Sequence, residues 1–265
     1  MKHLPLLGLT ISLAGGAGCD AHAVRCGPAE VAIIDRDTGA ALATHAFRGE
    51  YWVAVRPGAR YAVEIRNRTG ERLLAVASVD GINVISGETA AWSQTGYVFA
   101  PWERYDITGW RKSDSEVAAF TFTASPNSYA ERTGRPANVG VIGVALFQER
   151  RPQPDIAPGP DAPMSGFSDP GRARELGAAA GLAEERSMAP AAAPKLGTGH
   201  GERERSYVSN TEFDRMGDQP SAVIRIRYDS LENLVAMGIV PRPTWPSANP
   251  FPGSSRQGYV PDPPG

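Results

Sequence analysis

The sequence predicts a mainly β protein: an antiparallel β-sandwich or jelly-roll-like domain, followed by a small β-β-α element and Pro-rich segments. Three observations support this fold class. From about residue 30 to residue 149, apolar residues recur with a period of two, which is typical of strands with one buried face. Turn signals interrupt this pattern roughly every ten residues, as in sandwiches and barrels. A domain of roughly 120 residues buries an adequate core without disulfides or metal.

Nine short runs are expected to form the strands of this domain. They are residues 31–34, 51–55, 61–66, Leu73–Val79, 82–85, 97–100, 104–110, 117–123 and 139–147. In the third run, Tyr61, Val63 and Ile65 share one face. Asp80-Gly81 after the fourth run predicts a tight hairpin, because Gly accepts positive φ. The last run is apolar on both faces, which is typical of a central strand covered on both sides.

Changes in composition predict five segments. They are a signal peptide (1–23), the β-sandwich (24–149), a Pro/Ala/Gly-rich linker (150–196), a small docking element (197–240) and a Pro-rich tail (241–265). The linker and the tail each hold eight of the 23 prolines. Such segments cannot bury enough apolar surface to offset the entropy of ordering them, so we expect both to be disordered.

The docking element is expected to contain two strands, at residues 206–213 and 222–228, and a helix at 231–237. Asp229-Ser230 would cap that helix, and Leu231, Leu234 and Val235 would form its apolar face. Because so small an element cannot fold alone, we expect it to dock on the sandwich or on a partner protein.

The first 23 residues predict export. A short basic start precedes the apolar residues 4–13, and Ala21-His22-Ala23 suits signal peptidase, which accepts small side chains. The alternative is a lipoprotein anchored through Cys19, although the preceding residues lack the usual Leu. We therefore expect a periplasmic or secreted protein. No later run approaches 18 apolar residues, so no transmembrane segment is predicted.

Few residues suit metal or cofactor chemistry. Signal cleavage would leave Cys26 without a partner and only two histidines, His45 and His200, so neither a disulfide framework nor a zinc site is expected, and no cofactor is indicated. The net charge is −2 and no basic run is long, which argues against nucleic-acid binding. No G-x-S-x-G motif marks a serine hydrolase.

An aromatic cluster between residues 92 and 110 is the main candidate binding surface. Aromatic faces exposed on a β-sandwich stack on sugar rings or on peptides, whereas buried ones fill the core, and the sequence leaves both possibilities open. Arg111 either pins the sandwich internally or lines a groove. The residues predicted to bind ligand are Trp92, Trp102, Tyr105, Trp110 and Arg111.

A Gly-rich stretch at residues 196–201 surrounds His200 and precedes Glu202. We expect its glycines to shape a tight docking loop, with His200 hydrogen-bonded across it. The catalytic alternative makes His200 a general base assisted by Glu202. No other catalytic residue is indicated.

Several strings of the chain resemble a family of exported proteobacterial proteins described only as hypothetical. These strings are residues 50–53, 78–84, 109–113, 138–144, 196–201 and 228–230. The resemblance covers most of the chain outside the Pro-rich segments. It implies export and a β-rich fold, and it carries no activity, cofactor or site residue.

Together these observations predict an exported, non-enzymatic binding or envelope-associated protein. Its partner would be an envelope protein or a glycan, and its oligomeric state does not follow from the sequence. Two alternatives remain open: a periplasmic hydrolase that uses His200, and a structural subunit of an envelope assembly.

Overall fold

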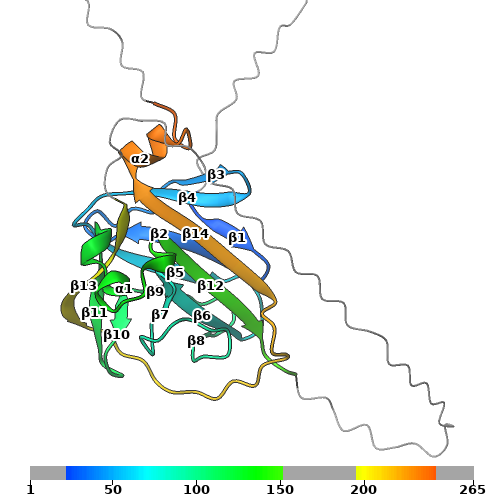
Figure 1. Ribbon diagram of the computed structural model, residues 1–265. Coiled ribbons are helices and arrows are strands. Elements are labelled where there is room, and N and C mark those ends of the chain that lie inside the picture. Colours follow the sequence, from blue (N-terminus) through cyan, green and yellow to red (C-terminus); the bar gives the residue numbers. More distant parts are fainter. Residues whose placement is uncertain (1–21, 152–194, 243–265) are drawn as a thin grey trace, which may run out of the picture.

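The computed structural model describes residues 22–151 and 195–242, which form two β-sheets packed face to face (Figure 1). This confirms the predicted mainly β, sandwich-like fold. The first sheet contains β1 (Val24–Cys26), β2 (Ala29–Asp35), β5 (Arg60–Asn67), β9 (Arg104–Ile107), β10 (Gly109–Arg111), β11 (Glu116–Ala124) and β13 (Leu196–Arg205). The second contains β3 (Thr44–Phe47), β4 (Glu50–Val55), β6 (Leu73–Val79), β7 (Ile82–Asn83), β8 (Tyr97–Phe99), β12 (Val141–Gln148) and β14 (Ala222–Ser230). Most of the predicted signal, linker and tail lies outside the described residues.

Short helices complete the described part of the chain. They are η1 (Ser125–Asn127), α1 (Tyr129–Arg132) and η2 (Pro136–Asn138), all between β11 and β12, and α2 (Leu231–Ala236) after β14. The predicted cap of α2 is confirmed, because the Ser230 side chain accepts a hydrogen bond from Asn233 N–H at 3.2 Å. Leu234 is buried as expected, but Leu231 is 48% exposed and does not belong to the apolar face.

Alternate residues of facing strands fill the space between the sheets. Along β5, Tyr61, Val63 and Ile65 are buried, as the alternation predicts. The ring of Tyr61 stacks on Phe122 of β11, with centroids 4.0 Å apart. Full burial of one large apolar side chain contributes about 1.5–3 kcal/mol. This layer of buried side chains therefore stabilises the packing of the two sheets and fixes the strands that carry the outer faces.

A buried polar network joins the two sheets at Asp80, which follows β6. Asp80 and Gly81 have φ of 52° and 75°, as the predicted hairpin turn requires. Three groups donate to the Asp80 carboxylate: Gly140 N–H (2.9 Å), Thr198 N–H (2.7 Å) and the Tyr228 hydroxyl (2.6 Å). The Thr198 hydroxyl in turn lies 2.7 Å from the hydroxyls of both Tyr228 and Tyr61. No ion pair with Asp80 occurs among the described residues, so hydrogen bonds alone stabilise this carboxylate.

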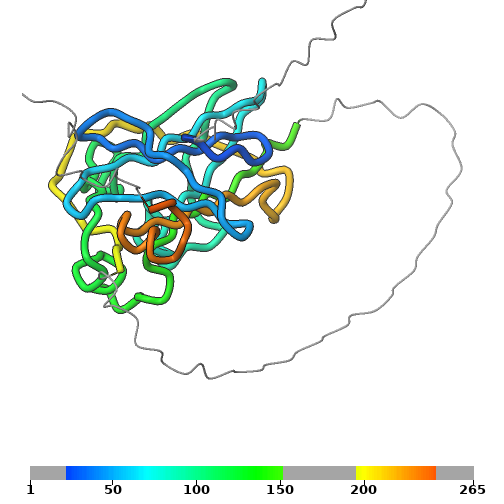
Figure 2. Tube along the Cα trace, turned by 90° about the horizontal axis from the view of Figure 1, so that it is seen from above, coloured from blue at the N-terminus to red at the C-terminus, as the bar shows by residue number. Residues whose placement is uncertain are grey.

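The two C-terminal strands are integral members of the sandwich. β13 pairs antiparallel with β11, and β14 lies between β12 and β4, pairing parallel with β4. Viewed from above, the yellow and orange C-terminal segments lie within the same body as the blue and green ones (Figure 2). The element expected to dock as a unit thus contributes one strand to each sheet.

One strand of this element lies elsewhere than predicted. Residues 206–213 form no strand, whereas Leu196–Arg205, assigned to the end of the linker and a docking loop, forms β13. The glycines of β13 permit close packing: a Cβ at Gly197 would lie 2.7 Å from Ser128 Cβ, and one at Gly201 would lie 2.7 Å from the Ala119 carbonyl oxygen. The Gly-rich composition thus reflects crowding beside a strand, and the loop assignment is wrong.

Candidate functional site

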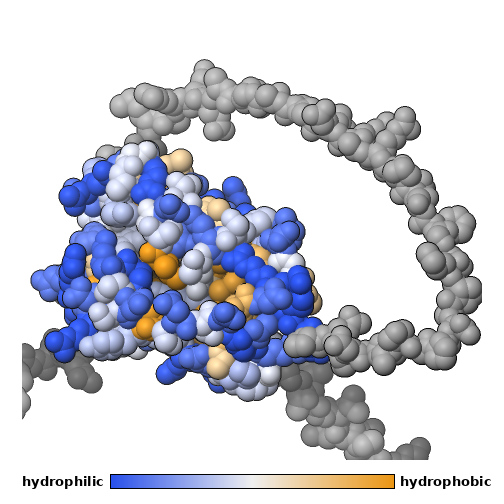
Figure 3. Space-filling model, turned by 90° about the horizontal axis from the view of Figure 1, so that it is seen from below, coloured by the Kyte–Doolittle hydropathy of each residue, from blue (hydrophilic) through white to orange (hydrophobic). Residues whose placement is uncertain are grey.

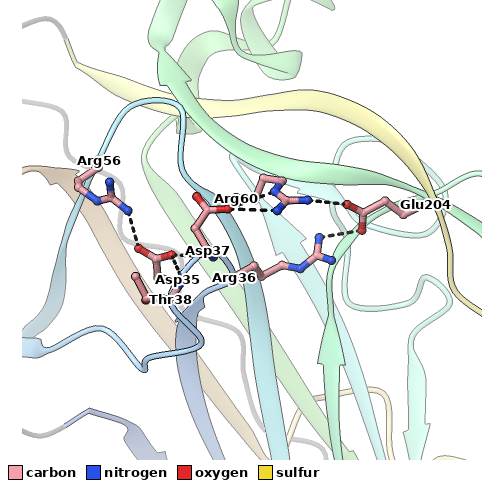
Figure 4. A network of polar contacts seen from close by, with 7 residues as sticks. All are labelled: Asp35, Arg36, Asp37, Thr38, Arg56, Arg60 and Glu204. Carbon is pink, nitrogen blue, oxygen red and sulfur yellow. Dashed lines mark hydrogen bonds and ion pairs between the residues drawn. The ribbon is translucent and has the colours of Figure 1, made fainter.

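Paired charges lie at the end of β2, where the chain turns toward β3, and beside β5 and β13. The side chains there alternate in sign and reach one another across β2, β5 and β13 (Figure 4). The ion pairs are Arg56–Asp35 (2.9 Å), Arg36–Glu204 (2.8 Å), Arg60–Asp37 (3.2 Å) and Arg60–Glu204 (3.5 Å). Because these groups already neutralise one another, this region offers little unbalanced charge to a ligand.

The outer face of the second sheet is apolar instead. Leu74 and Val76 of β6 pack with Ala145 and Phe147 of β12 in a second buried cluster, outside the main core. The segment between β13 and β14 covers part of this face with Phe213, and its Arg215 guanidinium lies 4.3 Å from the centre of the Phe147 ring. Figure 3, seen from below, shows apolar side chains near the middle of the molecule, surrounded by polar ones. One hollow is lined in part by this segment, and a second lies over β6, β12 and β14.

The first hollow, which we call the tyrosine cavity, has a volume of about 360 Å³. It lies between β8, the neighbouring ends of β9 and β10, and residues 207–211. Its characteristic side chains are Tyr97, Tyr105, Tyr207 and Arg111. Tyr97 is buried and its ring centroid lies 5.8 Å from that of Tyr105, whereas Tyr207 is 71% exposed at the rim. A volume of this size is in the range of small-ligand sites.

Arg111 both pins the chain and lines the tyrosine cavity. Its guanidinium donates to the carbonyl oxygen of Ser206 (2.6 Å), to the Ser206 hydroxyl (3.1 Å) and to the Tyr97 hydroxyl (3.1 Å). These bonds fasten the segment after β13 to β10, while the Tyr105 hydroxyl contacts the same Ser206 hydroxyl at 3.1 Å. Burial raises the pKa of Tyr97, and the hydrogen bond and charge of Arg111 act in the opposite direction. Arg111 therefore fills both roles that the sequence left open: it holds the chain together internally and it lines a cavity.

The second hollow, which we call the outer-face groove, has a volume of about 320 Å³. Its floor is formed by β6, β12 and β14, where Val76, Ala145 and Val223 lie on the outer face. Trp92 and Arg225 line its sides. Trp92 is 47% exposed, and Arg225 is exposed on β14.

Comparison with known proteins adds no identification. No family model, no curated protein and no solved structure matches the chain. The resemblance to the exported hypothetical family therefore stays a prediction, and the geometry of the two hollows carries the functional argument.

The structure distributes the five predicted binding residues over four environments. Tyr105 and Arg111 line the tyrosine cavity, and Trp92 lines the outer-face groove. Trp102 is 63% exposed on a turn and lines neither hollow. The prediction that Trp110 binds ligand is wrong. Trp110 is only 3% exposed and packs edge-on against the Phe120 ring, because its side chain points into the core between the sheets.

Sequence reasoning missed Tyr207 and Arg225. Tyr207 fell in the residues predicted as a strand, so its place at a cavity rim was not visible. Arg225 alternates with Ile224 and Ile226, and it is exposed while both isoleucines are buried. The alternation does not reveal that Trp92, from a loop more than 100 residues earlier, lines the same groove.

The structure gives His200 no catalytic partner among the described residues. His200 lies exposed on β13, 6.1 Å from the Tyr129 ring, and no hydrogen bond or ion pair joins it to Glu202 or to another carboxylate there. Burial and then the positive charge of Lys112 lower the pKa of His200. In the same part of the chain, no three His, Cys, Asp or Glu side chains are grouped as a metal site would require. Nor does any described helix have the length and apolarity needed to cross a membrane.

Proposed function

We propose that this chain is an exported, non-enzymatic binding protein, and that its tyrosine cavity takes a neutral, hydroxyl-bearing ring such as a sugar unit of an envelope glycan. The observation that carries the proposal is the convergence of Tyr97, Tyr105 and Tyr207 with Arg111 in one hollow on the molecular surface. Tyrosine offers a flat apolar face to a ring and a hydroxyl to its substituents.

The charges of the cavity favour an uncharged ligand. Arg111 supplies one positive charge, while Glu103 and Asp114 at the rim are acidic. An anion would approach two carboxylates, and the guanidinium donors are already directed at Tyr97 and Ser206. Hydroxyl groups, by contrast, both donate to carboxylates and accept from phenols, so a polyhydroxylated ring suits both kinds of group in the lining.

Binding of neutral sugars by the full chain tests this proposal. We expect saturable binding of at least one of three probes, N,N′-diacetylchitobiose, maltose or cellobiose, in isothermal titration calorimetry. Tyr207→Ala removes a stacking ring worth about 1 kcal/mol and should weaken binding roughly fivefold, without lowering the thermal midpoint because the side chain is exposed.

Tyr51→Ala is the matched control, since Tyr51 is another exposed tyrosine and lies on β4, outside the cavity. It should leave the affinity unchanged. Failure of all three probes to bind, or equal losses in the two variants, would rule out the cavity as the binding site.

The structure also bears on the premise of the assembly alternative. In such an assembly the C-terminal element would dock on a partner protein, whereas β13 and β14 pair with β11, β12 and β4 of their own chain. We therefore retain the binding function as our proposal, with envelope association as its cellular setting.

A further inference from the structure

The outer-face groove presents side chains of β6, β12 and β14 to a ligand. Its three floor strands are each paired on both sides: β6 with β12 and with β7 and β8, β12 with β6 and β14, and β14 with β12 and β4. β12, the central strand of the floor, therefore has no free edge for an incoming peptide backbone, whereas β14 pairs with β4 only from Ile226 onward. The floor is also low, because Gly143 has no side chain and a Cβ there would lie 2.8 Å from Ser78 Oγ.

Trp92 forms an aromatic wall of this groove, on a loop whose backbone is held by hydrogen bonds. The Arg215 guanidinium donates to the carbonyl oxygens of Trp92 (2.6 Å) and Gln94 (2.7 Å), and the Gln94 side chain accepts from Ala91 N–H at 2.8 Å. These bonds hold the loop before any ligand arrives, which lowers the entropy cost of binding. The indole is 47% exposed and makes no ring or cation contact with another described residue, so part of it is accessible to a ligand.

Arg225 is the one charged side chain that lines the groove. In the described part of the chain it makes no ion pair and no side-chain hydrogen bond. Arg227, two residues along the same face of β14, differs: it pairs with Glu50 at 2.7 Å and lies 5.5 Å from the centre of the Trp52 ring. Arg225 thus brings an unbalanced positive charge to the groove, whereas Glu50 balances the charge of Arg227.

Three uncharged polar side chains lie in the same lining: Ser78, Thr89 and Asn138. None of them has a side-chain hydrogen bond to another described residue. Hydroxyl and amide groups of this kind both donate to and accept from sugar hydroxyls.

We infer that the outer-face groove binds a carboxylate-bearing sugar ring, with the ring stacked on Trp92 and the carboxylate on the Arg225 guanidinium. The planar guanidinium matches a carboxylate in a two-point hydrogen-bonded geometry. This site shares no lining residue with the tyrosine cavity and does not depend on it.

The test is a titration of the full chain with D-glucuronate and D-galacturonate, with D-glucose as the uncharged probe, following the indole N–H signal of Trp92 by NMR. We expect saturable shifts with at least one acid and an affinity about tenfold higher than for glucose. Arg225→Gln should abolish that preference, whereas Arg227→Gln, which removes the same charge from the same strand, should retain it.

Followed through the backbone amide signals of Val223 and Arg225, which line the same groove, Trp92→Ala should lose the binding of the acids, and Trp102→Ala, which removes another exposed indole, should not. Tyr207→Ala should leave the glucuronate affinity unchanged, which separates this inference from the proposed function. Equal affinity for acid and glucose, or no response to any probe, would overturn the inference. Shifts of the Trp92 signal with a Glu-rich peptide but not with the acids would also overturn it, in favour of an acidic protein partner.

Discussion

Removal of one hydroxyl from the buried network around Asp80 should destabilise the protein in a pH-dependent way. A carboxylate only accepts hydrogen bonds when ionised, so Tyr228 donates to Asp80, Thr198 donates to Tyr228, and Tyr61 donates to Thr198. Tyr228→Phe removes the donor that lies 2.6 Å from the carboxylate. A hydrogen bond to a charged group contributes about 1.5–3 kcal/mol, and we expect a loss of that size in the free energy of unfolding at neutral pH.

The pH dependence follows from the direction of the Asp80 pKa. Burial raises that pKa, while the Tyr228 hydroxyl and the backbone N–H groups of Thr198 and Gly140 lower it and only partly offset burial. Stability from this group is therefore greatest below the unfolded value of 3.8 and declines as pH rises through the folded pKa. Without the Tyr228 hydroxyl the folded pKa rises further, so the loss caused by Tyr228→Phe should be larger at about pH 7 than at about pH 3.

The assay is urea unfolding followed by far-ultraviolet circular dichroism at both pH values. Tyr61→Phe is the matched control, because it removes a buried hydroxyl of the same network that contacts Thr198 but not Asp80. We expect about 0.5–1.5 kcal/mol for this neutral hydrogen bond, with little dependence on pH. Equal losses in the two variants, or a Tyr228→Phe loss that does not grow with pH, would refute this account of the network.

Three further predictions concern stability. Trp110→Ala should lower the free energy of unfolding by about 3–5 kcal/mol, since it empties a buried site; a loss below about 1 kcal/mol in urea unfolding would contradict its core position. Gly197→Ala should cost about 1–3 kcal/mol because the new Cβ would lie 2.7 Å from Ser128 Cβ, whereas Gly217→Ala, with no atom within 4 Å, should be neutral in the same assay. For Asp35, burial acts to raise the pKa, but hydrogen bonds from Arg56 and two backbone N–H groups outweigh it and lower the pKa. Asp35→Asn should therefore be less stable than wild type at neutral pH, and the difference should vanish as acid titration passes below the folded pKa; a constant difference would contradict the assigned shift.

The strands of the sandwich were predictable because their side chains alternate in polarity. Tyr61, Val63 and Ile65 show this alternation without interruption, and the structure buries all three. The Asp80-Gly81 hairpin was predictable for a local reason as well, since few residues accept positive φ. Export and lipidation concern residues for which the structure gives no test, and they stay predictions.

The position of β13 was not predictable from the same signals. Its alternate positions are glycines, which carry no polarity, and the reason for them lies in the neighbouring strand β11 and in Ser128. The tyrosine cavity has a similar origin, because it forms only when residues 207–211 lie beside β8, more than 100 residues earlier in the chain. The periodicity of a short stretch of sequence does not predict such long-range pairings. For the same reason the sequence did not separate Trp110, in the core, from Trp92, at the groove.

The most direct test of the proposed function is a map of the residues that respond to a neutral sugar. The full chain, labelled with nitrogen-15, would be titrated with N,N′-diacetylchitobiose, maltose and cellobiose while the backbone amide signals are followed by NMR. We predict saturable shifts that cluster at Tyr97, Tyr105, Arg111 and residues 207–211, which line the tyrosine cavity. Shifts confined to other faces of the sandwich, or no saturable shift with any of the three sugars, would contradict the assignment of this cavity as the ligand site.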